Sequence, residues 1–87
     1  MLYTPPTPSD LEKLKQELNL SSAGMADLFG VQGGRQWRKY TGGETPRDIS
    51  PHLLFFAMAR LELDSETMER ILNRMRAVGA TIELNQA

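Results

Sequence analysis

The sequence predicts an all-α protein of five helices joined by short connections. Two observations lead to this prediction. Five segments place apolar residues at the three- and four-residue spacing of a helix, and four of them begin at a residue suited to capping. Glycine or asparagine follows the end of most segments, where a left-handed backbone is needed. A chain of 87 residues suffices for one such domain, and the absence of cysteine excludes disulfides and thiolate metal sites.

The first helix is predicted over about residues 9–19. Residues 1–8 hold three of the five prolines, so we expect a non-helical arm, with residues 2–4 either a short strand or simply extended. Ser9 and Glu12 have the spacing of a capping box. The apolar residues that follow at helical spacing are Leu11, Leu14 and Leu18. Asn19 suits the left-handed stop.

The second helix is expected to start at Ser21 or Ser22 and to end before Gly30. Its buried face should consist of Met25, Ala26, Leu28 and Phe29. The third helix is predicted over about residues 33–41, from the glycine pair at 33–34 to the next pair at 42–43. We interpret the first pair as turn residues, and a nest of backbone amides for a phosphate is the alternative.

The predicted third helix has an aromatic face and a cationic face. Trp37 and Tyr40 lie one turn apart on one side, and the opposite side carries Arg35, Arg38 and Lys39. Across residues 30–47 these cations and Arg47 are opposed by Glu44 alone, a local charge of +3 in a chain of net charge −1. The pattern fits either a solvated cationic face or a surface for a polyanion.

The fourth helix is predicted to start at Ser50, with proline at its first helical position. Its apolar stripe comprises Leu53, Leu54, Ala57, Met58 and Leu61. Phe55 and Phe56 widen this stripe beyond what a surface helix needs. We therefore expect them to supply either additional core or a subunit interface.

The fifth helix is expected to be capped by Asp64 or Ser65 and to end at Gly79. Its apolar positions are Met68, Ile71, Leu72, Met75 and Val78, and Glu66 stands four residues before Arg70 in the favourable order. We interpret Arg70, Arg74 and Arg76 as a solvated face, with a second DNA contact as the alternative. Residues 80–84 alternate like a short strand. The expected organisation is an arm over 1–8, a helix-turn-helix domain over 9–79 and a C-terminal tail over 80–87, which is a candidate dimerisation strand.

The sequence contains no catalytic or metal-binding pattern. His52 is the only histidine and stands apart from any cluster of carboxylates, so a surface or capping role is expected. Ser21, Ser22 and Ser50 are explained as helix caps, and no base is spaced to activate them. We expect neither an enzyme nor a protein that needs a metal or another cofactor.

No apolar run approaches the roughly 20 residues that span a bilayer. The N-terminal residues also lack the charged-then-apolar pattern of a signal peptide. We therefore expect a soluble, cytoplasmic protein with no membrane partner, and the absence of cysteine suits a reducing compartment.

The stretch LNLSSAGMADLFGVQGGRQWRKYTGGETP, residues 18–46, resembles the lambda-repressor/Cro-like (XRE) family of helix-turn-helix DNA-binding proteins. The landmarks are the Leu-Ser entry to the second helix, the Met-Ala pair at 25–26, and the Phe-Gly-Val run at 29–31. Trp37, Tyr40 and Gly43 follow, and the five-helix order extends the resemblance over about residues 9–79. In this chain Trp37 comes one residue later than is usual in the family, and Thr41 replaces the usual acidic residue. A turn that is one residue longer around Gln32 restores the register.

The resemblance implies a role for each matching position. Ser22 corresponds to a position used against a phosphate, whereas Gly34, Arg35 and Lys39 correspond to positions that face base edges. Gln36 and Arg38 lie beside them. Arg35 is then the expected base reader, followed by Lys39, and Arg38 and Arg47 suit phosphates. Trp37 and Tyr40 are expected in the core, with exposed stacking platforms for single strands as the alternative.

Two functions follow as expectations. The first is a sequence-specific regulator of transcription, a repressor rather than an activator, which binds double-stranded DNA as a homodimer on an inverted repeat. The second is a protein-interaction module such as the antitoxin of a toxin–antitoxin pair. Three cations on one exposed helix face favour the first function.

Overall fold

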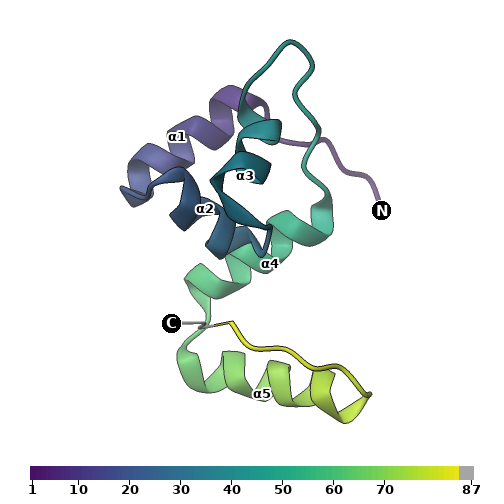
Figure 1. Ribbon diagram of the computed structural model, residues 1–87. Coiled ribbons are helices and arrows are strands. Elements are labelled where there is room, and N and C mark those ends of the chain that lie inside the picture. The colour runs from purple at the N-terminus through teal and green to yellow at the C-terminus, as the bar shows by residue number, and fades with distance from the viewer. Residues whose placement is uncertain (85–87) are drawn as a thin grey trace. The chain divides into compact units, whose positions relative to one another are not determined.

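The computed structural model describes residues 1–84 and contains five helices with no strand in that range (Figure 1). The helices are α1 Pro8–Leu18, α2 Ser22–Phe29, α3 Gly33–Thr41, α4 Pro51–Glu62 and α5 Ser65–Ala77. The all-α prediction is confirmed, and the strands suggested at residues 2–4 and 80–84 are not formed. The chain forms two compact units, Met1–Ala57 and a second from Met58 onward, which divide within α4. None of the described helices is both long enough and apolar enough to cross a membrane.

Helix α1 begins earlier than predicted, because its cap is Thr7 and not Ser9. The Thr7 hydroxyl accepts a hydrogen bond from the Asp10 amide at 3.0 Å, and the Asp10 carboxylate accepts one from the Thr7 amide at 2.9 Å. These two hydrogen bonds, the backbone one first, lower the pKa of Asp10. Pro8 is tolerated as the first helical residue because an amide there would lack a helical partner in any case. The prediction that residues 1–8 are entirely non-helical was therefore wrong at Pro8.

The first unit is built around a core of aromatic and aliphatic side chains from α1, α2, α3 and the segment before α4. Its largest fully buried side chains are Trp37, Phe29, Met25 and Ile49. The rings of Phe29 and Trp37 are 4.9 Å apart between centroids, and those of Trp37 and Tyr40 are 6.5 Å apart. Burial of Trp37 and Tyr40 confirms the predicted core face of α3. The Trp37 Nε1 is buried with no hydrogen-bond partner in the described part of the chain.

The two phenylalanines of α4 have different environments. An edge carbon of the Phe56 ring lies 3.0 Å from the point that a Cβ on Gly30 would occupy, so Phe56 packs on the turn that follows α2. Gly30 itself has a φ of 72°, which favours glycine and confirms the predicted stop. Phe55, by contrast, is 77% exposed. The expected apolar excess on α4 thus separates into one packed ring and one ring on the surface.

The N-terminal arm is attached to the segment before α4 by Tyr3. Its hydroxyl donates a hydrogen bond of 2.6 Å to the backbone oxygen of Ile49, a buried residue. Desolvation, followed by the charge of Asp48, raises the pKa of the Tyr3 phenol. The phenol therefore remains a hydrogen-bond donor throughout the neutral range.

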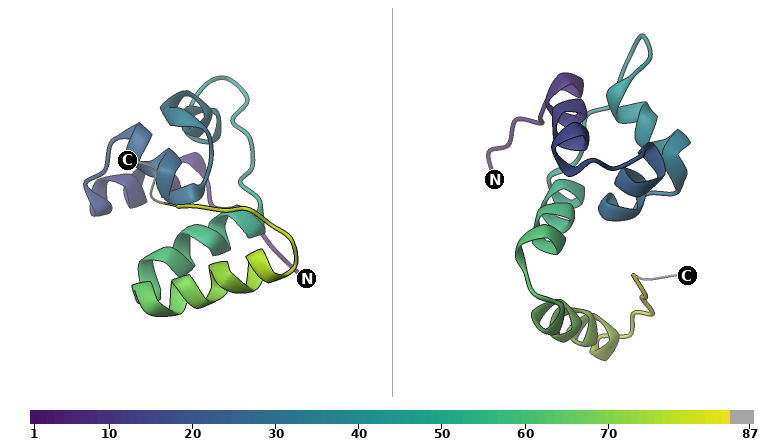
Figure 2. Two further views of the ribbon diagram at one scale, coloured as in Figure 1. Left: turned by 60° about the horizontal axis from the view of Figure 1, so that its bottom comes forward. Right: turned by 90° about the vertical axis from the view of Figure 1, so that its left-hand side faces the viewer.

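In the second unit, the segment after α5 turns back beside that helix (Figures 1 and 2). Arg76 holds this segment, since its guanidinium donates to the Ile82 backbone oxygen at 2.8 Å. The same guanidinium contacts Glu69 and Asn73, both at 2.8 Å. The expectation of a solvated Arg76 was therefore wrong. The short strand expected here does not form, and a side chain rather than a neighbouring strand bonds the Ile82 carbonyl.

Candidate nucleic-acid interface

Helices α2 and α3 form a pair joined by a turn of three residues, Gly30 to Gln32. The turn is closed by hydrogen bonds from the Gly30 and Val31 amides to the carbonyls of Asp27 and Ala26. Because Trp37 and Tyr40 are held in the core, the rotation of α3 about its axis is determined. The opposite face of α3 is exposed and carries Arg35, Arg38 and Lys39, as predicted.

Arg35, Arg38 and Lys39 line one surface groove, together with Gly42 and Gly43 at the end of the helix. The groove has a volume of about 480 Å³. Within residues 1–84, none of these three cations forms an ion pair with a carboxylate. Their charges are not neutralised locally, and together they attract an anion to this side of α3.

Arg47 joins this surface through a backbone contact that its position in the sequence does not reveal. Its amide donates a hydrogen bond of 2.8 Å to the Lys39 carbonyl, in the last turn of α3. The loop between α3 and α4 extends beyond the helices before it returns to this bond (Figures 1 and 2). Arg47 is exposed. The bond therefore brings a fourth cation to the end of α3, where helix carbonyls also favour positive charge.

Gly34 lies where α3 packs closely on the start of α2. A Cβ on this residue would stand 3.0 Å from the Ser22 Cβ, 3.2 Å from the Ala23 amide nitrogen and 3.3 Å from an Arg38 guanidinium nitrogen. The Arg38 side chain therefore lies back along α3 towards the start of α2. Ser22, Gly34 and Arg38, three residues singled out from the sequence, meet at this crossing.

Replacing Gly34 with alanine should destabilise the protein by about 1–3 kcal/mol. The added methyl group would press on the Ser22 Cβ and on the α2 backbone, which cannot rotate away as a flexible side chain can. Urea unfolding followed by circular dichroism measures the effect. Gly43→Ala is not a neutral control, because Gly43 has a φ of 86°. Ala23→Ser, at an exposed helical position, is the control and should change the unfolding free energy by less than about 0.5 kcal/mol.

The two adjacent glycines thus have different roles, which the sequence did not separate. Gly33 has a φ of 80° with no atom near its missing Cβ, so it serves the turn. Gly34 is helical and serves the close packing of α2 on α3. The packing role of Gly34 depends on a distance between two helices, which the sequence does not contain. The one signal in the sequence was that Gly34 lies in the first turn of a helix that follows a short connection. Gln36 is half-buried beside the cationic face.

Among residues 1–84, no group of three or more histidine, cysteine, aspartate or glutamate side chains is arranged to hold a metal ion. Comparisons with known protein families, with curated proteins and with solved structures found no match to this chain.

Proposed function

We propose that this protein is a sequence-specific regulator of transcription, a repressor of the helix-turn-helix type, which binds double-stranded DNA through α3. One observation carries the proposal. The buried Trp37 and Tyr40 direct Arg35, Arg38 and Lys39 together to the opposite, exposed side of a short helix. An α-helix fits the major groove of B-DNA, and a cationic helix face suits the flanking phosphates.

The positions of the cations support different roles for them in DNA binding. Arg35 is in the first turn of α3, the end of a recognition helix that approaches base edges, and its exposed guanidinium can bond guanine O6 and N7. Lys39 lies one turn further along the same face. Arg38 lies back towards Ser22 and the start of α2, where the amides of the first helical turn favour an anion. We therefore assign Arg38, Ser22 and Arg47 to phosphates.

A homodimer on an inverted repeat completes the proposal. A helix of nine residues reads only a few base pairs, so two copies are needed to specify a site. Phe56 is engaged with the turn at Gly30, which leaves Phe55 as the exposed aromatic of α4 for such a contact.

The affinity for duplex DNA should fall steeply as the salt concentration rises. Each phosphate neutralised by a cation of the α3 surface releases counterion. A plot of log affinity against log salt concentration therefore has a slope of about −0.9 per phosphate contact. Fluorescence anisotropy would compare a duplex obtained by selection from random sequences with a scrambled duplex of equal length. A specific site should retain a large advantage over the scrambled duplex at physiological salt. Equal, weak binding to both duplexes would contradict the proposal.

The second candidate function is a protein-interaction module, such as the antitoxin of a toxin–antitoxin pair. The observation that favours it lies in the second unit, where apolar side chains of α5 are on the surface. A domain of this kind need not discriminate between DNA sequences, so the same anisotropy comparison separates the two candidates.

A further inference from the structure

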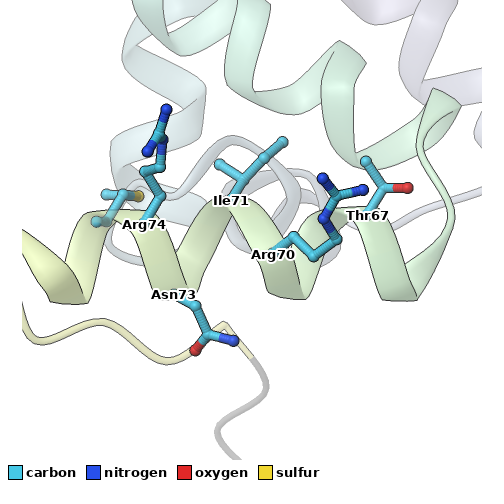
Figure 3. A pocket seen from close by; sticks show the side chains of 6 residues that line it. Thr67, Arg70, Ile71, Asn73 and Arg74 are labelled. Carbon is cyan, nitrogen blue, oxygen red and sulfur yellow. The ribbon is translucent and has the colours of Figure 1, made fainter.

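One face of α5 is exposed, apolar at its centre and cationic at its edge. The α5 face consists of Thr67, Arg70, Ile71, Arg74 and Met75, which line a groove of about 720 Å³. Ile71 is 42% and Met75 38% exposed, and both arginines are exposed. Thr67, Ile71 and Arg74 leave one side of the helix, and the Arg70 guanidinium bends along it towards Thr67 (Figure 3).

The two arginines of the α5 face have no carboxylate partner within residues 1–84. Glu66, one turn before Arg70, forms no ion pair with it, although their spacing would allow one. Glu69 is engaged by Arg76 at 2.8 Å. The charges of Arg70 and Arg74 therefore face outward, beside the apolar surface of Ile71.

We propose that the α5 face docks an acidic amphipathic helix of a second protein. Arg70 and Arg74 lie one turn apart, so two carboxylates three or four residues apart on the partner helix can reach one arginine each. Apolar residues of the same partner helix then cover Ile71 and Met75. Amphipathic helices that bind in a groove of another protein are held in this way, by apolar residues at the centre of the contact and charged residues at its edge.

Charge argues against a second copy of this chain as the occupant. Two α5 helices related by a two-fold axis through Ile71 pair antiparallel, and equivalent edges of the two helices then meet. Arg70 and Arg74 of both copies would gather along one edge. Like charges set against each other cost free energy, and Glu66, one turn before Arg70 on the same edge, can offset only one of the two arginines of each copy, so a net positive charge remains there.

A nucleic acid and a membrane surface fit the α5 face less well than an acidic helix. The phosphates of a nucleic acid would place charged groups over Ile71 and Met75. The apolar surface of these side chains would then contribute no favourable free energy to binding. A membrane surface is held by the apolar area that a helix buries in it, and the α5 face offers only Ile71 and Met75 for this purpose. The proposal goes beyond DNA binding and does not depend on it.

The test starts from a selection of random linear peptides on the full-length protein. Selected peptides should be enriched in acidic residues that flank apolar ones at a spacing of three or four. Calorimetry with the strongest peptide should show Arg74→Glu weakening binding by about tenfold or more. Ile71→Ser should weaken it by a similar factor, through lost apolar contact. The control, Lys13→Glu on α1, makes the same change in charge and should alter binding by less than about twofold.

Several results would overturn the proposal. One is selected peptides without acidic enrichment, and another is Arg74→Glu behaving like Lys13→Glu. Binding to phosphatidylserine vesicles that Arg74→Glu abolishes would assign the α5 face to a membrane. Self-association in sedimentation that Ile71→Ser removes would assign it to a second copy. Circular dichroism verifies the fold of each variant, and these exposed positions should tolerate substitution.

Discussion

Trp37→Ala should destabilise the protein strongly, with a loss of about 3–5 kcal/mol in the free energy of unfolding. Trp37 is fully buried, and its ring contacts both Phe29 from α2 and Tyr40 one turn further along α3. Truncation would leave a cavity where α2 and α3 meet. A domain of this size has about 5–15 kcal/mol of stability in total, so the loss is a large share of it.

Denaturation followed by circular dichroism measures this effect, because the variant has no tryptophan left to fluoresce. Leu2→Ala is the control, since it truncates a large apolar side chain that is fully exposed, and it should change stability by less than about 0.5 kcal/mol. Trp37→Phe should cost much less than the alanine variant, because it keeps an aromatic ring and removes the unpaired Nε1 donor. Equal stabilities for the two alanine variants would contradict the assignment of Trp37 as the centre of the core.

Arg35→Ala should weaken binding to the selected DNA site by about 1–3 kcal/mol and relax the preference at one base position, a guanine. The side chain is exposed near the start of α3, opposite the buried aromatic face. Arg38→Ala should instead weaken binding to selected and random DNA about equally. The dependence of log affinity on log salt concentration should also become shallower by about one unit, because Arg38 lies towards the start of α2, where we propose that it binds a phosphate.

A binding selection repeated with each variant separates these two roles, and Lys13→Ala on α1 serves as the control for a lost positive charge. The register of α3 determines which side chain reads the base. If Arg35→Ala keeps the full base preference and Gln36→Ala or Lys39→Ala loses it, the proposed register is wrong. If none of these variants alters binding, the proposal that α3 contacts DNA fails.

Local patterns in the sequence were sufficient to predict most of the helices. The bounds of α3 and the burial of its two aromatic residues depend on glycine positions and on a repeat of three to four residues. Both are properties of neighbouring residues. The same reasoning failed at the start of α1, because Thr7 with Asp10 and Ser9 with Glu12 both have the form of a capping box. The sequence pattern alone does not decide between two such overlapping registers.

The sequence by itself determined that α3 has a cationic face opposite a buried aromatic one, since helical periodicity relates residues 35–40 to one another. Only the tertiary structure decided which other groups join that face. Arg47 arrives through its bond to the Lys39 carbonyl, and Arg38 lies near Ser22 because Gly34 has no side chain. In α5, the structure decided that Arg76 holds the Ile82 carbonyl while Arg70 and Arg74 stay exposed. The physical reason is that these contacts join residues brought together by turns and helix crossings, and periodicity within one helix carries no information about them.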